Sequence, residues 1–390
     1  MTFTGTTAIA GIGATEFSKD SGRSELRLAA ECVSHALADA GLTPSDVDGM
    51  VSFTMDGNAE IALARELGIP ELTFFSRVHY GGGAAAATVQ QAAMAVASGI
   101  ADVVVAYRAF NERSGMRFGR VSAAAAQQVN TSGVDNAFHY PMGIATPAAT
   151  VAMVAQRYLH EYGATSEDFG KIAVVDRAHA ATNPNAWFHG RPITLAEHQA
   201  SRWVAEPLHL LDCCQESDGG VALVITSLER ARDLRQAPVV VSAAAQGSGP
   251  DQYVMTSYYR DELAALPEMG VVGRQLWAQS GIGPSDVDVA VLYDHFTPYV
   301  LMQLEELGFC GRGEAKDFIA GDTLTLDGKL PLNPHGGQLG EAYIHGMNGI
   351  AEAVRQLRGT AANQVANAGT AVVTAGTGVP TSGLVLTQAR

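Results

Sequence analysis

Cysteine is scarce in this sequence. Its 390 residues include only Cys32, Cys213, Cys214 and Cys310. Four thiols are too few for a disulfide scaffold, and their separations lack the paired spacing of a structural zinc site. The cysteine content therefore excludes a disulfide-rich secreted module, gives no reason to expect a metal, and is typical of a protein from a reducing cytoplasm.

Basic residues are also few, with 25 Lys and Arg against 40 Asp and Glu and a formal charge of -15. A net negative charge repels a phosphate backbone, so we do not expect a nucleic acid partner. No run approaches the ~18 apolar residues of a membrane-spanning helix, and the N-terminus lacks the basic start and apolar core of a signal peptide. We expect a cytoplasmic protein without a membrane span.

Short apolar runs rich in Ala, Val and Gly recur along the chain, of which 47% is hydrophobic. Runs without strict alternation are typical of strands that are buried on both faces and connected by helices. We expect strands at 7–13, 102–109, 171–176, 219–226, 238–247, 287–294 and 370–376. Helical spacing of apolar residues predicts helices at 25–42 and 84–97. The fold class is therefore α/β.

An internal repeat indicates a duplication. The sequence GLTPSDVD at 41–48 recurs as GIGPSDVD at 281–288, and in each copy Pro-Ser-Asp predicts a short capped turn that leads into a strand. Further segments recur in the same order: a Gly-rich turn before a helix (81–97 and 336–357), an apolar strand (102–107 and 370–375) and a closing strand (220–226 and 383–387). We expect two similar halves, 1–235 and 236–390, and a loop-domain insertion in the first half at about 111–205.

In a duplicated pair of this kind, the N-termini of the helices after the two Gly-rich turns face one another. Their free N–H groups stabilise developing negative charge, which predicts an oxyanion and substrate pocket between them. The residues that we expect around this pocket are His79, Tyr80, Gly82, His335, Gly337 and Gly376.

A series of short motifs carries a family resemblance. They are SGIADVV at 98–104, YPMG at 140–143, AEPL at 205–208 with LDCC at 211–214, SDGG at 217–220 and NPHGG at 333–337. In this order they resemble the thiolase superfamily, in particular the sterol-carrier-protein-x thiolases and their lipid-transfer-protein relatives in actinobacteria. The resemblance implies a thiolase-like fold of two α/β halves in a layered αβαβα arrangement, with a pocket for an acyl-CoA thioester.

The sequence departs from this family at its catalytic positions. The helix start that carries a thiolase's nucleophilic cysteine reads YGGGA at 80–84. The family's catalytic histidine falls on Tyr343, and its second cysteine falls near Thr374. The His-Asp-Cys-Phe motif of the sterol-carrier group reads Tyr-Asp-His-Phe at 293–296. Without the cysteine, no acyl-enzyme is expected at this position.

A thiolase-like pocket without the thiolate can still stabilise the enolate of an acyl-CoA, which is the intermediate of a retro-aldol cleavage. This cleavage needs a group that takes the β-hydroxyl proton and a donor that protonates the enolate carbon, and a phenol can do either. We expect Tyr293 and Tyr343 to be this acid/base pair, with Tyr343 as the donor in an interim assignment. Asp294, His295 and His345 are the expected supporting residues, and the reaction needs neither a metal nor a cofactor beyond the CoA of the substrate.

A more specific resemblance is to the lipid-transfer-protein aldolases of actinobacterial sterol catabolism. It implies cleavage of a 17-hydroxy steroid carboxyl-CoA to a 17-ketosteroid and propionyl-CoA. A tertiary hydroxyl cannot be oxidised to a ketone, so such a substrate cannot be cleaved by thiolysis. The resemblance also implies a homodimer, and a small OB-fold and zinc-ribbon partner protein that completes a heterotetramer.

Two other readings remain open at this stage. One is a non-catalytic thiolase-like scaffold that binds lipid or CoA. The other is a thiolase or acyltransferase with a relocated nucleophile, which requires Cys213 or Cys310 in the pocket; we expect the Cys213-Cys214 pair to serve packing instead. The Arg-rich segment 108–117 could bind CoA phosphates or stabilise an interface.

Overall fold

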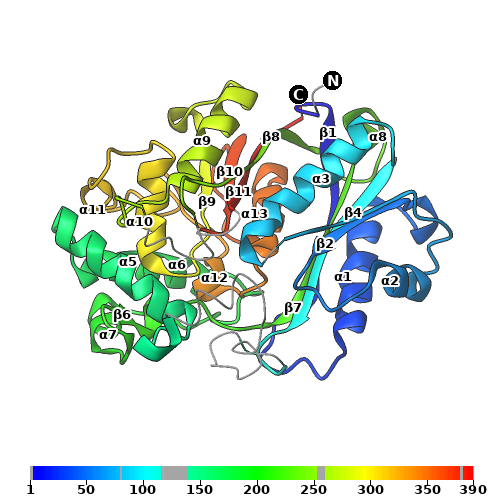
Figure 1. Cartoon of the computed structure of the whole chain (residues 1–390). Helices are drawn as coiled ribbons and strands as arrows, with labels where there is room; N and C mark the ends of the chain where they lie inside the picture. Colours follow the sequence, from blue (N-terminus) through cyan, green and yellow to red (C-terminus); the bar gives the residue numbers. More distant parts are fainter. Residues whose placement is uncertain are drawn as a thin grey trace.

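The computed structural model of the chain describes residues 3–79, 81–115, 117, 139–252, 260–377 and 381–389 (Figure 1). Its strands are β1 (Thr7–Ala14), β2 (Gly49–Phe53), β3 (Phe74–Val78), β4 (Val103–Asn111), β5 (Trp203–Ala205), β6 (Leu208–His209), β7 (Asp218–Ser227), β8 (Val239–Gly247), β9 (Val289–Val291), β10 (Thr370–Ala375) and β11 (Thr381–Gln388). Its helices are α1 (Glu25–Ala40), α2 (Glu60–Leu67), α3 (Ala85–Ala97), α5 (Pro147–Tyr162), α6 (Ser166–Thr182), α7 (Leu195–Ala200), α8 (Leu228–Arg232), α9 (Pro267–Ser280), α10 (Thr297–Glu306), α11 (Ala315–Phe318), α12 (Gly337–Gly340) and α13 (Met347–Arg358).

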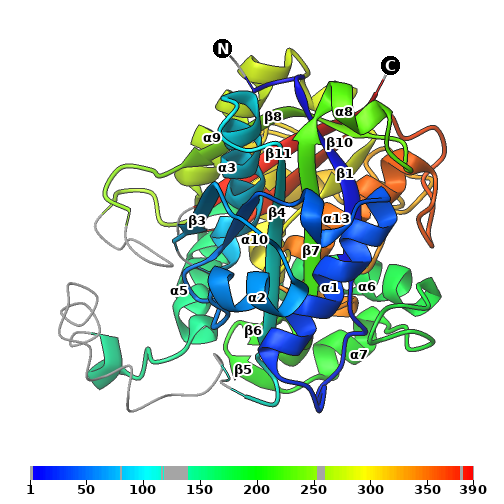
Figure 2. The same ribbon diagram turned by 90° about the vertical axis from the view of Figure 1, so that its right-hand side faces the viewer.

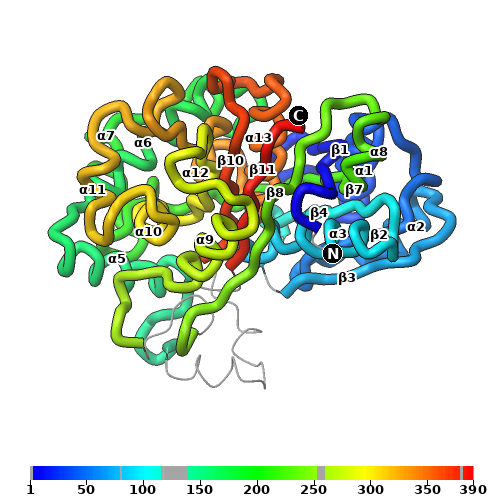
Figure 3. Tube along the Cα trace, turned by 90° about the horizontal axis from the view of Figure 1, so that it is seen from above, coloured from blue at the N-terminus to red at the C-terminus, as the bar shows by residue number. Residues whose placement is uncertain are grey.

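The strand order confirms the duplicated α/β fold. A nine-stranded sheet runs in the order β3-β2-β4-β7-β1-β8-β11-β10-β9. In the first half β2 pairs parallel with β4, and β7 lies antiparallel between β4 and β1. The second half repeats this pattern, with β9 parallel to β10 and β11 antiparallel between β10 and β8. The two half-sheets join where β1 and β8 pair antiparallel (Figure 3).

Helices cover both faces of each half-sheet and form the layers. Along β4, Val103, Val105 and Tyr107 pack on the side of α1, whereas Val104 and Ala106 pack on the side of α3, because successive side chains of a strand point to opposite faces. Figure 2 shows α1 and α2 in front of β4 and β7, on the outer face of the first half. Helix α9 covers the outer face of the second half by packing on β8 and β11.

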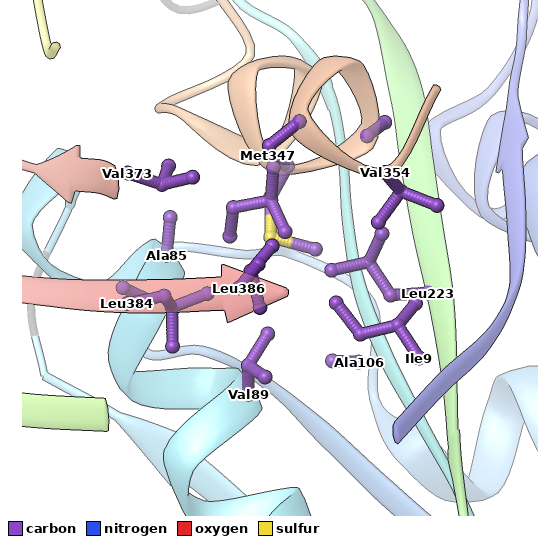
Figure 4. Packing of buried hydrophobic residues seen from close by; sticks show 14 of the residues in the cluster. Ile9, Ala85, Val89, Ala106, Leu223, Met347, Val354, Val373, Leu384 and Leu386 are labelled. Carbon is purple, nitrogen blue, oxygen red and sulfur yellow. The ribbon is translucent and has the colours of Figure 1, made fainter. Parts of the chain in front are cut away.

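The central layer consists of α3 and α13, which pack against strands of both halves. Figure 4 shows side chains from both helices and both half-sheets in one apolar cluster, namely Ala85, Val89, Met347 and Val354 from the helices, Ile9, Ala106 and Leu223 from the first half, and Val373, Leu384 and Leu386 from the second. The sheet therefore folds around a shared helical layer, and the layers alternate as αβαβα.

The repeated Pro-Ser-Asp turns are confirmed. Pro44–Asp46 and Pro284–Asp286 each form a single 3-10 turn. The Asp46 carboxylate accepts a hydrogen bond of 2.9 Å from the backbone N–H of Thr43, and Asp286 accepts one of 2.8 Å from that of Gly283. Strands β2 and β9 follow these turns, as the sequence predicts.

Two expectations for local structure are wrong. Residues 171–176 do not form a strand but lie inside α6, where the buried side chains of Phe169, Ile172, Ala173, Asp176 and Ala180 recur at helical spacing. The helix expected over 336–357 is divided into α12 and α13. The intervening turn has positive φ angles at His345 and Gly346, at 50° and 87°, which an α-helix cannot accommodate.

The insertion between β4 and β7 carries α5, α6 and α7, and it packs on the second half of the molecule. Val151 of α5 and Ile172 of α6 share an apolar cluster with Met269 of α9 and Leu301 of α10. Viewed from above, these green helices lie on the side of the second half (Figure 3). No helix within the described ranges is long and apolar enough to cross a membrane.

Candidate active site

A cavity of about 880 Å³ opens where the two half-sheets and the insertion meet. Several residues of its wall lie shortly beyond the carboxyl end of a strand: Lys19 after β1, Met55 after β2, Glu112 after β4, Tyr293 after β9 and Gly376 after β10. Ligands of α/β proteins bind beyond the carboxyl ends of strands. The position of the cavity therefore matches that of a substrate site.

The structure brings Tyr293 and Tyr343 together in this cavity. Both side chains line its wall, and their hydroxyl oxygens lie 3.0 Å apart, within hydrogen-bonding distance. Burial raises the pKa of both phenols well above their usual value. Both groups are therefore neutral near pH 7, and each can donate one hydrogen bond while it accepts another.

Hydrogen bonds to its backbone groups hold Tyr293 in place. Its N–H donates to Oγ1 of Thr374 over 2.9 Å, and its carbonyl oxygen accepts from Nε2 of Gln303 over 2.9 Å. Thr374 Oγ1 donates in turn to Oε1 of Gln303 over 2.6 Å. Thr374 thus helps to position Tyr293.

The start of α3 has no room for a nucleophilic side chain. A Cβ atom on Gly82 would lie 1.8 Å from the hydroxyl oxygen of Tyr293. This is far inside van der Waals contact, so the phenol occupies the space that a side chain at residue 82 would fill. Gly82 lines the cavity, as does Gly376, which has a φ angle of 68°.

Tyr343 and His345 lie on the turn between α12 and α13. The Tyr343 N–H donates to Oγ of Ser217 over 3.2 Å, and the rings of Tyr343 and His345 lie 4.7 Å apart. The Nε of Arg108 donates to Nδ1 of His345 over 3.3 Å, so the proton of the neutral imidazole lies on Nε2. Burial and the charge of Arg108 lower the pKa of His345 well below its usual value. His345 is therefore a neutral hydrogen-bond donor in the cavity wall.

Arg108 is buried and forms an ion pair with Asp56 at 3.3 Å. It binds neither CoA nor an interface, which are the two roles considered for segment 108–117. Arg113 and Arg117 of the same segment line the cavity, and Arg117 also pairs with Glu216. The segment thus divides into a buried anchor for His345 and two cations in the wall.

The expected supporting residues separate into two groups. His295 lines the cavity 4.7 Å from the ring of Tyr293, and burial lowers the pKa of His295 to about 3. Asp294 points away from the cavity and accepts hydrogen bonds from the backbone N–H groups of Gln338 at 2.7 Å and Leu339 at 3.0 Å. Its carboxylate therefore fixes the start of α12 and cannot reach a substrate in the cavity.

Three of the residues expected around the pocket lie outside its wall. Gly337 packs against Asp294, whose Oδ2 would lie 2.1 Å from a Cβ at residue 337. His335 is buried behind the site, 3.9 Å from Glu341. His79 is exposed and contacts Thr54 at 3.3 Å. Tyr80 is outside the described residues.

The paired cysteines also line the cavity. The Cys214 N–H donates to the carbonyl oxygen of His295 over 2.8 Å, which joins this segment to the loop after Tyr293. Burial raises the pKa of Cys213 to about 12 and that of Cys214 well above its usual value. A thiol with a raised pKa forms little of the nucleophilic thiolate. Cys310 is not part of the wall.

Sequence reasoning missed several charged residues of the wall, among them Lys19 and Glu112, although each of these two follows the end of an expected strand. Lys19 Nζ donates to the carbonyl oxygen of Glu216 over 2.6 Å, and burial, together with Arg113, lowers the pKa of Lys19 to about 8. Among the described residues, no cluster of three or more His, Cys, Asp or Glu side chains could hold a metal ion.

Fold and site together are those of a thiolase-like enzyme whose cavity holds two adjoining phenols. Residues 7–229 match the family described as "Thiolase, N-terminal domain", and residues 252–387 match "Thiolase C-terminal domain-like". The chain therefore belongs to the thiolase family.

Individual relatives are more specific. The chain is 70% identical over 382 residues to the 17-hydroxy-3-oxo-4-pregnene-20-carboxyl-CoA lyase of Mycobacterium tuberculosis, covering 98% of this chain and 99% of that protein. It is 68% identical to the steroid side-chain-cleaving aldolase of Thermomonospora curvata, over 98% of each chain. The solved structure of the Ltp2-ChsH2(DUF35) aldolase superposes with a TM-score of 0.96 at 66% identity, covering 100% of this chain and 99% of that chain.

Proposed function

We propose that this protein is a carbon–carbon lyase that cleaves a 17-hydroxy steroid acyl-CoA by retro-aldol chemistry. The products are a 17-ketosteroid and propionyl-CoA. The observation that carries this proposal is the pair of phenols, 3.0 Å apart, in a cavity where Tyr293 leaves no space for a side chain at residue 82. The 70% identity to a lyase named for such a substrate supports it.

The two phenols can carry the proton that the reaction must move. In the proposed reaction Tyr293 accepts the proton of the 17-hydroxyl, while Tyr293 passes its own proton to Tyr343 across their hydrogen bond. The bond between C17 and the α-carbon breaks, its electrons form the enolate of the thioester, and Tyr343 protonates the α-carbon. The proton lost by the hydroxyl thus returns to the propionyl group, and no other reactant is consumed. Because the relay uses neutral phenols, their raised pKa values favour it.

Other wall residues fit the two ends of the substrate. His345 offers its Nε2–H group as a hydrogen-bond donor. Phe188, Ile193, Leu210 and Phe296 provide an apolar surface suited to steroid rings. The cations of the wall, Arg113, Arg117, Arg177 and Arg202, suit the phosphates of CoA in a chain whose net charge is otherwise strongly negative.

The test is incubation with a synthetic 17-hydroxy steroid acyl-CoA, with the 17-ketosteroid and propionyl-CoA measured by mass spectrometry. We expect both products from the wild type and a loss of ~10²–10⁴-fold in turnover for Tyr293→Phe and Tyr343→Phe. Tyr162→Phe, whose residue lies outside the cavity wall, is the matched control. Near-normal turnover in both active-site variants would contradict the relay. A wild type that gives no products, either alone or co-expressed with a DUF35 partner protein, would indicate a catalytically silent scaffold.

We further propose that the enzyme works in the cytoplasm as a homodimer that binds a DUF35 protein with an OB fold and a zinc ribbon, forming a heterotetramer. The solved Ltp2-ChsH2(DUF35) aldolase, at 66% identity, supports such a complex. Co-expression with the DUF35 protein of the same organism should raise turnover, and light scattering should give the mass of a complex with two copies of each chain. Full activity of the isolated chain would contradict the need for the partner.

A further inference from the structure

Glu112 is an ionisable group of the cavity wall for which the proposed relay has no role. Glu112 directly follows β4, and its side chain lines the same cavity as Tyr293 and Tyr343. The residue is 1% exposed to solvent. Among the described residues, none forms a hydrogen bond with its Oε2. A buried carboxyl oxygen without a protein partner beside a substrate cavity is available to the ligand.

The surroundings of Glu112 favour its neutral form. An ionised carboxylate that is buried without a hydrogen-bond partner on one oxygen costs several kcal/mol, so the group takes up a proton instead. Burial accordingly raises the pKa of Glu112 well above its usual value. The charged groups that act on it are Arg108 of β4 and Lys19, which oppose the rise, and Glu216 and Asp218, which add to it. The neutral Cys214, Tyr293 and Tyr343 also lie within its electrostatic reach.

We propose that Glu112 is a further catalytic residue, whose protonated carboxyl donates a hydrogen bond to the thioester oxygen as the enolate forms. This inference rests on the proposed function. A protonated carboxyl cannot serve as the base for the 17-hydroxyl, and it is most useful at an oxygen that gains negative charge. In a retro-aldol cleavage the thioester oxygen gains this charge, whereas the 17-oxygen ends as a ketone. A neutral acid held in a dry pocket stabilises such an enolate oxygen strongly.

The protonation state of Glu112 determines the direction in which turnover changes with pH. An ionised Glu112 would repel the enolate and would have no proton to donate. Turnover should therefore be highest while Glu112 is protonated and should fall as the pH rises through its pKa. A glutamine at this position keeps an N–H donor and does not titrate, so it should remove this fall.

The experiment compares Glu112→Gln with Glu112→Ala in the enzyme co-expressed with its DUF35 partner. We expect Glu112→Gln to keep turnover within about tenfold of the wild type and to lose the alkaline decline, and Glu112→Ala to lose ~10²–10³-fold, the usual effect of removing an oxyanion donor. The matched control is Glu305→Gln, because Glu305 is another buried carboxyl with a raised pKa but lies outside the cavity wall. Melting temperatures of all variants show whether each one is folded.

A second readout follows enolate formation without steroid cleavage. Propionyl-CoA in deuterated water exchanges its α-hydrogens whenever the site forms its enolate, and mass spectrometry measures the rate. Glu112→Ala should slow this exchange and Glu112→Gln should largely preserve it.

The outcomes separate the two proposals. Equal losses in Glu112→Gln and Glu112→Ala would show that a carboxylate is required, and would overturn the inference. Unchanged turnover and exchange in Glu112→Ala would overturn it as well. A wild type that exchanges propionyl-CoA but does not cleave the steroid thioester would refute only the proposed function. A wild type that does neither would refute both.

Discussion

Gly82 is the single residue that leaves space for Tyr293 at the start of α3. With no side chain there, the ring of Tyr293 reaches the N-terminal end of α3. The phenol pair and a nucleophile at residue 82 are therefore mutually exclusive uses of the same space.

Gly82→Ala tests this exclusion. Its Cβ would lie 1.8 Å from the Tyr293 hydroxyl oxygen, so the phenol must move away from Tyr343. We expect turnover to fall by ~10²-fold or more, because a displaced proton carrier no longer reaches its partner. Gly283→Ala is the control, since residue 283 has an ordinary φ of -108° and its repeat counterpart is Thr43. Turnover in Gly82→Ala within twofold of the wild type would mean that the ring tolerates displacement.

Sequence motifs placed Tyr293, Tyr343 and His345 in the site, because all three lie in segments that align with the family's catalytic motifs. The residues that tune them could not be found in this way. Arg108 and Asp56 are 52 positions apart and meet only through the folded sheet. The same holds for Asp294, whose neighbour Tyr293 lines the cavity but whose own side chain points to α12.

At the level of elements, α6 shows how a short apolar run can be mistaken for a strand. The run at 171–176 reads as a buried strand when taken alone. The deciding signal lies upstream, where Thr165 and Asp168 form a capping box that starts a helix. A short apolar run cannot distinguish a strand from a buried helix, so the cap has to be weighed with it.

Helix α6 also contributes Asp176, a buried carboxyl that lies near the buried Asp294 of the second half. Burial and the nearby Asp294 raise the pKa of Asp176 well above its usual value, and burial raises that of Asp294 to about 6. A folded-state pKa above the unfolded value means that the stabilisation is complete below about pH 4 and is lost as the pH rises through the folded pKa.

Asp176→Asn should therefore flatten the pH dependence of stability. We expect the melting temperature of the wild type to fall, relative to that of the variant, as the pH is raised from about 5 to about 8. Thermal unfolding at several pH values measures this difference. If the melting temperatures of the wild type and of Asp176→Asn changed in parallel over this pH range, Asp176 would not be protonated in the folded protein.

At the level of the whole molecule, the duplication was predictable because the repeated turns and strands keep their order. The joining of the two half-sheets through β1 and β8 was not predictable, because the paired residues, such as Ile9 and Val239, lie far apart in the sequence. Nor was the packing of the insertion on the opposite half. Both depend on contacts between surfaces that exist only after each half has formed.

The shared central layer predicts that the halves unfold together. Leu386→Ala removes a fully buried side chain from the cluster around α3 and α13, and should cost about 2–5 kcal/mol. Hydrogen exchange of β4 and β10 peptides in denaturant should show equal losses of protection in both. Ile100→Ala, at a residue that is 54% exposed, is the control and should change neither. A loss confined to β10 would indicate that the halves are independent.

The insertion between β4 and β7 separates two tasks along the chain. The two phenols are anchored to the second half-sheet and the turn before α13, whereas Phe188, Ile193, Leu210 and Leu211 reach the cavity from one contiguous stretch. Exchange of that stretch between homologues would alter the acyl groups admitted and leave the reaction centre in place.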